Sequence, residues 1–333
     1  MPNLSFNQKI VSVSINQNAF FSALAVVLGL SLIHLTGQAT LAGFLVVAIQ
    51  SVSGINAKTT LLKRSGMVLQ GALILIATTT LAVLTRTNLL FTLVGAVLLA
   101  FSFAYWRQLF PKNWPDIVIP AGVLYFMALT DHRLLEPIIA TATGGALGLV
   151  LDFILGLLLV TYKPIPLEGT EEITTASKLW LPQSLVIYAI ELGLLLVIGL
   201  TIDHYAGYPH GYWMPFTAIV VLQVSHTQTL KKVGERLLGT LAGCIAGSFI
   251  LFLHPSPLVQ ILLSGVLVFL FLYFVRKNYA VAVIFITMFV LLLLGSHAAN
   301  PYAIALERVV FTIIGGLLAV LSSFVFLSKK QLT

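Results

Sequence analysis

The segment that decides the fold is MPFTAIVVLQVSHTQTLKKVGERLLGTLAGCI, residues 214–245. An apolar run ends near Gln223, a basic turn follows, and a second apolar run carries Gly239, Gly243 and Gly247 at intervals of four. Residues four apart share one face of a helix, and small residues on that face let helices approach closely where lipid offers no hydrophobic drive for association. The segment therefore predicts two close-packed membrane helices joined by a basic turn.

Composition extends this prediction to the whole chain. Of the 333 residues, 59% are hydrophobic and 9% are charged, and the mean hydropathy is +1.02. The apolar runs cover 17–41, 39–54, 65–85, 88–106, 116–130, 137–161, 182–201, 212–225, 235–253, 257–275, 279–295 and 303–327. At about 20 residues per crossing, these runs leave no room for a folded soluble domain. The sequence predicts an all-α, polytopic transmembrane helical bundle of about twelve helices.

The basic residues predict the orientation. With the N-terminus inside and twelve crossings, every Lys and all but three Arg fall in inner segments, leaving Arg86, Arg133 and Arg308 outside. By the positive-inside rule both termini are expected in the cytoplasm, with the first apolar run retained as a span. The net charge of +7 is then a topology signal, and no motif indicates a nucleic-acid partner.

An internal repeat relates the two halves. When residues 41–73 are placed beside residues 214–245, Gln50 aligns with Gln223, and Arg64 aligns with Arg236 after one inserted residue. Six runs in each half make the halves parallel. The predicted domains are a first six-helix repeat (1–162), a cytoplasmic linker (163–181) and a second six-helix repeat (182–333).

A finer repeat lies inside each half. An acidic residue precedes a glycine by eight positions three times, in helices that enter from opposite faces. This predicts nested three-plus-three inverted units, an organisation typical of secondary transporters. The acidic residues are Glu136, Glu235 and Glu307, and the predicted helix-packing glycines are Gly144, Gly148, Gly239, Gly243, Gly247 and Gly315. The charge pairs that begin at Glu235 and Glu307 are expected at the membrane edge, either as anchors or in contact with a solute.

Four runs are short for a crossing and occupy matching places: 39–54, 116–130, 212–225 and 279–295. Short or interrupted helices in corresponding positions indicate a solute site near the midplane, although tilted packing helices are the alternative. Pro120 and Pro215 are expected to interrupt two of them. Gln50 and Gln223 are expected as solute donors.

Two carboxylates lie within apolar runs, Asp152 and Glu191. A carboxylate buried in a membrane is costly when ionised, so it tends to hold a proton and can load or release one as access alternates. Both are candidates for proton coupling, and a structural polar contact between helices is the alternative for each.

Other chemistries have no signal in the sequence. The single cysteine, Cys244, and the scattered histidines form no metal-ligand pattern, and no nucleophile-base set, phosphate loop or zinc-protease motif is present. We therefore expect neither an enzyme nor a cofactor.

The segment GYWMPFTAIVVLQVSHTQTLKKVGERLLGTLAGCIAG, residues 211–247, resembles the signature of the fusaric acid resistance-like (FUSC) and aromatic acid exporter family. The positions that carry the resemblance are Tyr212, Trp213, Pro215, Thr217, Gln223, Arg236, Gly239, Thr240 and Gly243. It implies export of aromatic carboxylates and related organic anions across the bacterial inner membrane, driven by the proton gradient. Val224 stands where the family often has proline, and the large cytoplasmic domains of longer members are absent.

Together these patterns predict a proton-coupled organic-anion exporter. Basic clusters at the inner turns would concentrate anions, although the positive-inside rule alone also accounts for them. Aromatic residues including Tyr125 and Phe216 would stack on an aromatic acid or belong to an interfacial belt. The predicted substrate-pathway residues are Gln50, Gln223, Tyr212, Trp213, Thr217, Arg236 and Arg64, and the predicted partners are the organic anion, the lipid bilayer and a second copy of the chain in a homodimer. An anion channel or uniporter, and a non-transporting membrane scaffold, remain as alternatives.

Overall fold

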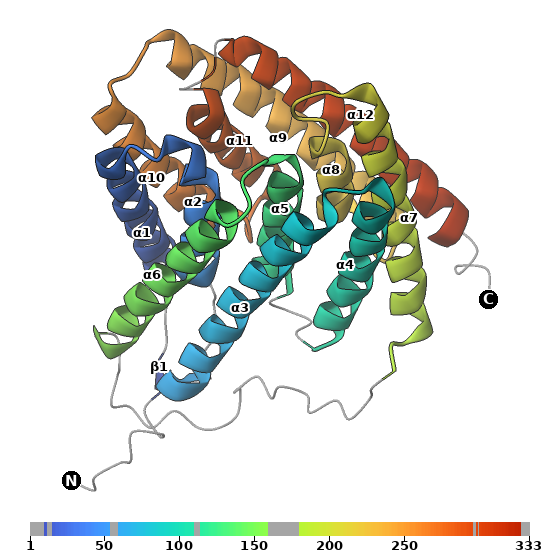
Figure 1. Cartoon of the computed structure of the whole chain (residues 1–333), viewed down its shortest axis with the longest axis horizontal. Coiled ribbons are helices and arrows are strands. Elements are labelled where there is room, and N and C mark those ends of the chain that lie inside the picture. The colour runs from blue at the N-terminus through green and yellow to red at the C-terminus, as the bar shows by residue number, and fades with distance from the viewer. Residues whose placement is uncertain are drawn as a thin grey trace, which may run out of the picture.

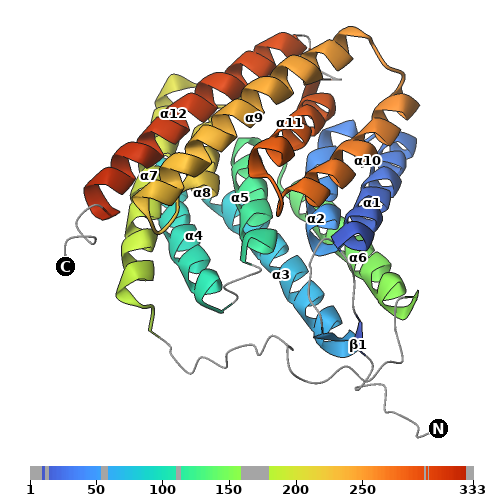
Figure 2. The same ribbon diagram turned by 180° about the vertical axis from the view of Figure 1, so that it is seen from behind.

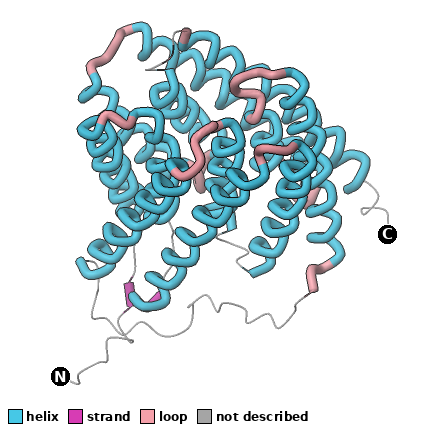
Figure 3. The backbone as a smooth tube through the Cα atoms, viewed as in Figure 1, coloured by secondary structure: helices cyan, strands magenta, loops and turns pink. Residues whose placement is uncertain are grey.

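The computed structural model describes residues 10–11, 15–53, 59–109, 114–158, 180–295, 298 and 300–327. These residues form twelve α-helices, one 3-10 turn and one pair of two-residue strands (Figures 1 and 3). The helices are α1 (Ile15–Thr36), α2 (Ala42–Ser53), α3 (Leu61–Thr85), α4 (Leu89–Leu109), α5 (Trp114–Thr130), α6 (Glu136–Leu158), α7 (Gln183–Ala206), α8 (Trp213–Val221), α9 (His226–Phe252), α10 (Pro257–Phe274), α11 (Tyr279–Gly295) and α12 (Pro301–Leu327). The turn is η2 (Ala39–Leu41), and strand β1 (Ile10–Val11) pairs antiparallel with β2 (Thr59–Thr60).

Each predicted apolar run overlaps one helix, so the predicted polytopic helical membrane fold is confirmed. Eight helices are long and apolar enough to cross a bilayer: α1, α3, α4, α6, α7, α9, α10 and α12. The other four, α2, α5, α8 and α11, are the runs predicted to be short. At 1.5 Å per residue, the 12 residues of α2 extend only about 18 Å, against a hydrocarbon core of about 30 Å.

The long helices surround the short ones. Among the described residues, every exposed large hydrophobic side chain lies on a long helix or in a loop, and none lies on α2, α5, α8 or α11. All nine residues of α8 are buried. The long helices therefore present the apolar surface that lipid covers, and the short helices make up the interior of the bundle.

The long helices pack against one another in pairs. Helices α3 and α6 lie side by side at the front in Figure 1, and α9 and α12 lie side by side at the front of the reverse view in Figure 2. Two further pairs join the halves, because α1 packs on α10 and α4 packs on α7.

Glycines let the short helices approach the long ones. A Cβ atom added at Gly243 of α9 would lie 2.7 Å from the carbonyl oxygen of Ile284 in α11. A Cβ atom added at Gly148 of α6 would lie 3.0 Å from the carbonyl oxygen of Ile49 in α2. A Cβ atom added at Gly315 of α12 would meet the backbone of α8. Gly144, Gly239 and Gly247 make equivalent contacts with α2 and α11. Each of these glycines is a point where a larger residue would meet a neighbouring helix.

The helices that carry the two charge pairs begin earlier in the sequence than the predicted apolar runs 235–253 and 303–327. Helix α9 begins at His226, well before Glu235, and α12 begins at Pro301, before Glu307. Charged residues therefore lie inside both helices rather than at their ends. Helix α9 tolerates this because Arg236 is buried against the interior of the bundle and Lys231 lies 3.9 Å from Glu235 one turn away.

Two other predictions are affected by the described structure. Pro120 lies inside α5 as predicted, but Pro215 lies in the first turn of α8, where the proline nitrogen removes no helical hydrogen bond. The predicted linker, residues 163–181, lies outside the described residues except for Trp180 and Leu181.

Candidate anion site between the short helices

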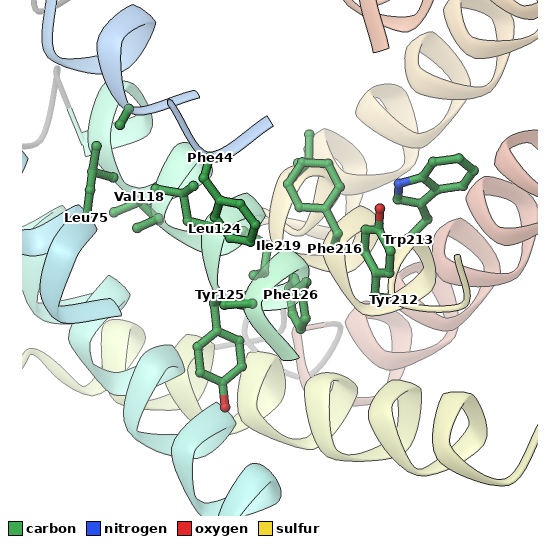
Figure 4. Close-up of a cluster of buried hydrophobic side chains, with 14 of the residues drawn as sticks. Phe44, Leu75, Val118, Leu124, Tyr125, Phe126, Tyr212, Trp213, Phe216 and Ile219 are labelled. Carbon is green, nitrogen blue, oxygen red and sulfur yellow. The ribbon is translucent and has the colours of Figure 1, made fainter. Parts of the chain in front are cut away.

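One cavity is lined by all four short helices. It has a volume of about 180 Å³, and its wall includes Gln50 of α2, Phe126 of α5, Trp213 of α8 and Tyr279 of α11. Most of its other lining residues are apolar, and Figure 4 shows Phe126, Phe216 and Trp213 among the buried side chains of this region. A cavity of about 150 Å³ holds one benzene molecule, so this one has room for a single aromatic ring.

Two arginines from the long helices complete the wall. Arg236 of α9 and Arg308 of α12 both line the cavity and are only 4% and 3% exposed. Nε and Nη2 of Arg236 and Nε of Arg308 are buried without a hydrogen-bond partner. Among the described residues, neither guanidinium lies within ion-pair distance of a carboxylate. The cavity therefore carries two positive charges that the described protein does not balance.

Aromatic rings hold both guanidinium groups in place. The guanidinium carbon of Arg308 lies 4.7 Å from the centre of the Trp213 ring and 5.9 Å from that of Phe216. Arg236 reaches the same Phe216 ring at 5.9 Å. Cation–π contacts of this kind contribute roughly 0.5–2 kcal/mol each. They orient the arginines, but they do not offset the cost of removing a charge from water, which is several kcal/mol per ion.

Aromatic contacts connect the cavity wall to the α7–α8 loop. His210, in that loop, stacks on Trp213 with ring centres 4.7 Å apart and planes 18° apart. Nδ1 of His210 lies 2.6 Å from a carboxylate oxygen of Glu307. Glu307 therefore interacts with His210, and its neighbour Arg308 turns into the cavity.

Tyr279 is a further lining residue, and Lys232 lies beside it. The Lys232 ammonium lies 5.1 Å from the centre of the Tyr279 ring. The Tyr279 hydroxyl is buried without an aligned hydrogen-bond partner and interacts with the Arg236 side chain. Lys232 and Arg236 are four residues apart on α9 and so lie on one face of the helix.

Two of the predicted site residues pair with each other instead of lining the cavity. Nε of Arg64, on α3, donates to the two carboxylate oxygens of Asp152, on α6, at 3.1 and 3.0 Å. The two side chains are 0% and 2% exposed. The structure thus brings together a residue predicted for the substrate pathway and one predicted for proton coupling, in a buried ion pair of the first half.

The other predicted pathway residues divide between the cavity and the backbone. Gln50, Tyr212 and Trp213 line the cavity. Gln223 does not line it, and its side-chain amide donates to the Leu222 carbonyl at 2.8 Å. The Thr217 hydroxyl donates to the Trp213 carbonyl at 2.7 Å, within α8.

Tyr125 also lies away from the cavity. Its hydroxyl donates to the Thr92 carbonyl of α4 at 3.1 Å, and Figure 4 shows the ring pointing away from Phe216 and Trp213. Phe216, in contrast, lines the cavity.

Glu191 lies apart from the cavity, on α7. It is 0% exposed, and both of its carboxylate oxygens are buried without an aligned hydrogen-bond partner. The polar group that acts on it is the hydroxyl side chain of Ser322 on α12. Tyr188, one turn away on α7, carries the guanidinium of Arg107 5.1 Å above its ring. Glu191 is thus a buried acid on an interface between long helices.

Sequence reasoning did not single out Tyr279, and it considered Arg308 only within the Glu307 charge pair, as an anchor or a solute contact. A signal for Arg308 was present, since it is one of only three basic residues placed outside by the positive-inside pattern. The other two hold loops: Arg86 donates to the His132 carbonyl at 3.3 Å, and Arg133 donates to the Thr40 hydroxyl at 2.6 Å. No comparable signal marks Tyr279, whose role depends on where α11 begins.

Within the described residues, no group of three or more His, Cys, Asp or Glu side chains is placed to hold a metal ion. The candidate site is thus defined by two guanidinium groups, aromatic rings and a ring-sized space. Such a set can bind an aromatic anion.

Comparisons with known proteins agree with the motif. Residues 194–322 match a family model described as fusaric acid resistance protein-like, which confirms the predicted resemblance for the second half of the chain. The matched region contains Tyr212, Trp213, Arg236, Tyr279 and Arg308. No solved structure matches this chain.

Several curated proteins are similar over the same length of chain. An uncharacterised protein, slr1298, from Synechocystis is 34% identical over 136 residues, which are 40% of this chain and 18% of that protein. Inner membrane protein YccS of Escherichia coli is 37% identical over 134 residues, 38% of this chain and 18% of that protein. Uncharacterised protein ORF2 of Neisseria gonorrhoeae is 32% identical over 134 residues, 40% and 32% of the two chains. The match thus spans less than a fifth of the first two relatives.

Proposed function

We propose that this chain is a secondary transporter of the bacterial inner membrane that exports aromatic carboxylates or related organic anions, because residues 194–322 match the fusaric acid resistance protein-like family model. The observation that carries the proposal is the pair of buried guanidinium groups, Arg236 and Arg308, on the wall of one ring-sized cavity. A bound anion would supply the charge that these arginines lack, and the rings of Trp213 and Phe216 would stack on its aromatic part.

The positions of the arginines support movement of the anion through the cavity. Arg236 follows the predicted inner end of α9, next to Lys232 and Tyr279, and Arg308 follows the predicted outer end of α12, next to Trp213. An anion that enters past Lys232 would meet Arg236 first and leave past Arg308. His210 and Tyr279 would move aside alternately, because a site open at both ends would conduct without coupling.

The helix pairing supports the proposed organisation as two parallel six-helix repeats joined by a linker. In the proposed repeat, α1 corresponds to α7 and α4 corresponds to α10. The contact of α1 with α10 is then the counterpart of the contact of α7 with α4, and both contacts are present. Such an arrangement places the four short helices around one central axis, and transporters bind their solutes where repeats meet near the midplane.

We assign proton coupling to Glu191. The carboxyl group is buried between helices of the second repeat and its oxygens have no aligned donor. An ionised carboxylate in that setting is costly, so protonation and deprotonation would favour different packings of α7 against α12. The carboxyl of Asp152, in contrast, is held by Arg64, and we assign that pair to the stability of the first repeat.

Two other functions predict different behaviour. An anion channel or uniporter would use the same arginines, but its flux would follow voltage and would not need Glu191. A membrane scaffold would need neither the arginines nor Glu191 for any flux.

The test is the flux of p-hydroxybenzoate in proteoliposomes that contain the full chain, under a pH gradient and then under voltage alone. We expect flux that follows the pH gradient, that is lost in Arg308→Gln and that no longer responds to the pH gradient in Glu191→Gln. Arg133→Gln is the matched control, since it makes the same change at an arginine outside the cavity. Flux that follows only voltage and survives Glu191→Gln would favour the channel, and no flux in any variant would favour the scaffold.

A further inference from the structure

We infer that the cavity is built for an aromatic dianion, such as a benzene dicarboxylate, rather than for a monocarboxylate. The inference rests on the proposed function and adds to it the charge and chemical class of the preferred ligand. It is carried by the number of unbalanced cations around the cavity and by the arrangement of those cations around one ring.

Two buried cations at the cavity lack a negatively charged partner among the described residues. Arg236 and Arg308 line the cavity, and Arg308 interacts electrostatically with Arg236, Tyr212, Cys244 and Tyr279, none of which carries a negative charge near neutral pH. The nearest acidic residues in the sequence already have partners, since Glu307 lies 2.6 Å from His210 and Glu235 lies 3.9 Å from Lys231. A monocarboxylate would leave one guanidinium unbalanced in a buried site, at a cost of several kcal/mol.

Both guanidinium groups lie against one aromatic ring of the cavity wall. Arg236 and Arg308 come from different long helices and approach the same Phe216 ring, each at 5.9 Å. Arg308 also faces Trp213 at 4.7 Å, which Arg236 does not. A ligand with an aromatic body and two carboxylates would place its ring against Phe216 and one carboxylate toward each arginine. The volume of about 180 Å³ limits the aromatic body to a single ring.

The first half of the chain shows the alternative arrangement. Its arginine, Arg64, has a resident carboxylate, Asp152, which lies sixteen positions after Glu136 on α6. Sixteen positions after Glu307 on α12 the chain has Ser323, whose hydroxyl lies 2.9 Å from His226. Arg236, which aligns with Arg64, therefore has no carboxylate at the position that corresponds to Asp152. The second half also has another cavity arginine, Arg308. The ligand would supply both negative charges.

The test is calorimetric binding of two ligands of nearly equal shape to the purified full chain in detergent. Terephthalate carries two carboxylates at neutral pH, and 4-carbamoylbenzoate replaces one of them by an uncharged amide. We expect terephthalate to bind about 10- to 100-fold more tightly, the range given by one charge-assisted hydrogen-bonding group. In Arg236→Gln and in Arg308→Gln, we expect that ratio to fall to about threefold or less, with binding of 4-carbamoylbenzoate changed by less than about tenfold.

Each outcome decides a different point. Arg133→Gln, the control outside the cavity, should keep the wild-type ratio and so shows that the purified protein is intact. Equal binding of the two ligands by the wild-type chain would overturn the dianion inference and leave the proposed anion transport standing. A preference for terephthalate that survives both cavity variants would overturn the assignment to these two arginines. Binding of neither ligand would overturn both the inference and the proposed function.

Discussion

The buried arginines provide a prediction in which the same chemical change has opposite effects at two sites. Arg64 has a carboxylate partner in Asp152, whereas Arg308 has none among the described residues. Replacing Arg64 by Met leaves the Asp152 carboxylate buried and unpaired, and breaking one side of a buried ion pair costs roughly 3–5 kcal/mol. Replacing Arg308 by Met removes an unbalanced buried charge, at the loss of a cation–π contact with Trp213 of up to about 2 kcal/mol.

We therefore expect Arg64→Met to lower the free energy of unfolding by about 3–5 kcal/mol. For Arg308→Met without ligand, we expect no loss, and a gain of up to about 2 kcal/mol, since functional sites hold groups that stability alone would not select. The assay is unfolding of the purified chain in lipid nanodiscs by increasing SDS. The double variant Arg64→Met, Asp152→Leu should recover most of the loss.

Two results would refute this reasoning. If Arg308→Met destabilised the ligand-free chain as much as Arg64→Met does, Arg308 would be a structural residue with a partner of its own. If the double variant were no more stable than Arg64→Met alone, the unpaired Asp152 carboxylate would not be the source of the loss.

Three further predictions concern packing, pH and access. Gly243→Ala should lower stability by about 1–3 kcal/mol because its Cβ would meet the Ile284 carbonyl at 2.7 Å, whereas Gly234→Ala on the same helix, where nothing lies within 4 Å, should be neutral or slightly stabilising in the same unfolding assay. In the α5–α6 loop, burial alone would raise the pKa of Asp131, but the hydrogen bonds and charge of Arg133 outweigh burial and lower that pKa. The ionised Asp131 therefore stabilises the folded chain above the unfolded-state pKa of about 4. This stabilisation is lost as the pH falls through the lower folded-state pKa. Asp131→Asn should accordingly be less stable than wild type at pH 7 and equal to it at the most acid pH at which both stay folded; a difference that persists there would point to a steric cause. Access to the cavity can be measured with Val283→Cys, in the cavity wall, in a Cys244→Ser background and with a membrane-impermeant thiol reagent. This cysteine should react faster from one side of the membrane when Tyr279→Ala is added, and faster from the other side when Trp213→Ala is added. Equal rates with and without these two changes would show that the Tyr279 and Trp213 rings do not close the cavity.

The helices could be predicted from the sequence because each one is a hydrophobic run bounded by polar residues. The short helices were also predictable, since a run such as 212–225 is too short to cross the bilayer and has a counterpart in the other half. The start of α9 was not, because the turns before Glu235 carry Lys231 and Lys232, which read as a loop on hydropathy alone. Lysine is a good helix former, so a polar helical extension of the apolar run is compatible with these residues but is not marked by hydropathy.

The candidate site was predictable only in part. Arg236 and Trp213 stand in a motif, so their residue types and order pointed to the site. Arg64 and Arg236 align in the predicted repeat and could not be told apart, because the difference between them is Asp152, which lies 88 residues from Arg64 in the chain. Arg308 was placed at a membrane edge for a similar reason: only the packing of α12 against α8 shows that it reaches Trp213.

The most direct test of the central claim is to locate an aromatic anion on the protein itself. A crystal structure of the full chain with 4-iodobenzoate, a ligand whose iodine can be found by anomalous scattering, would do so. We expect iodine in the cavity between α2, α5, α8 and α11, with the carboxylate within hydrogen-bonding distance of Arg236 or Arg308. Iodine found only at the lipid-facing surface or beside Arg64, with the cavity empty, would contradict it.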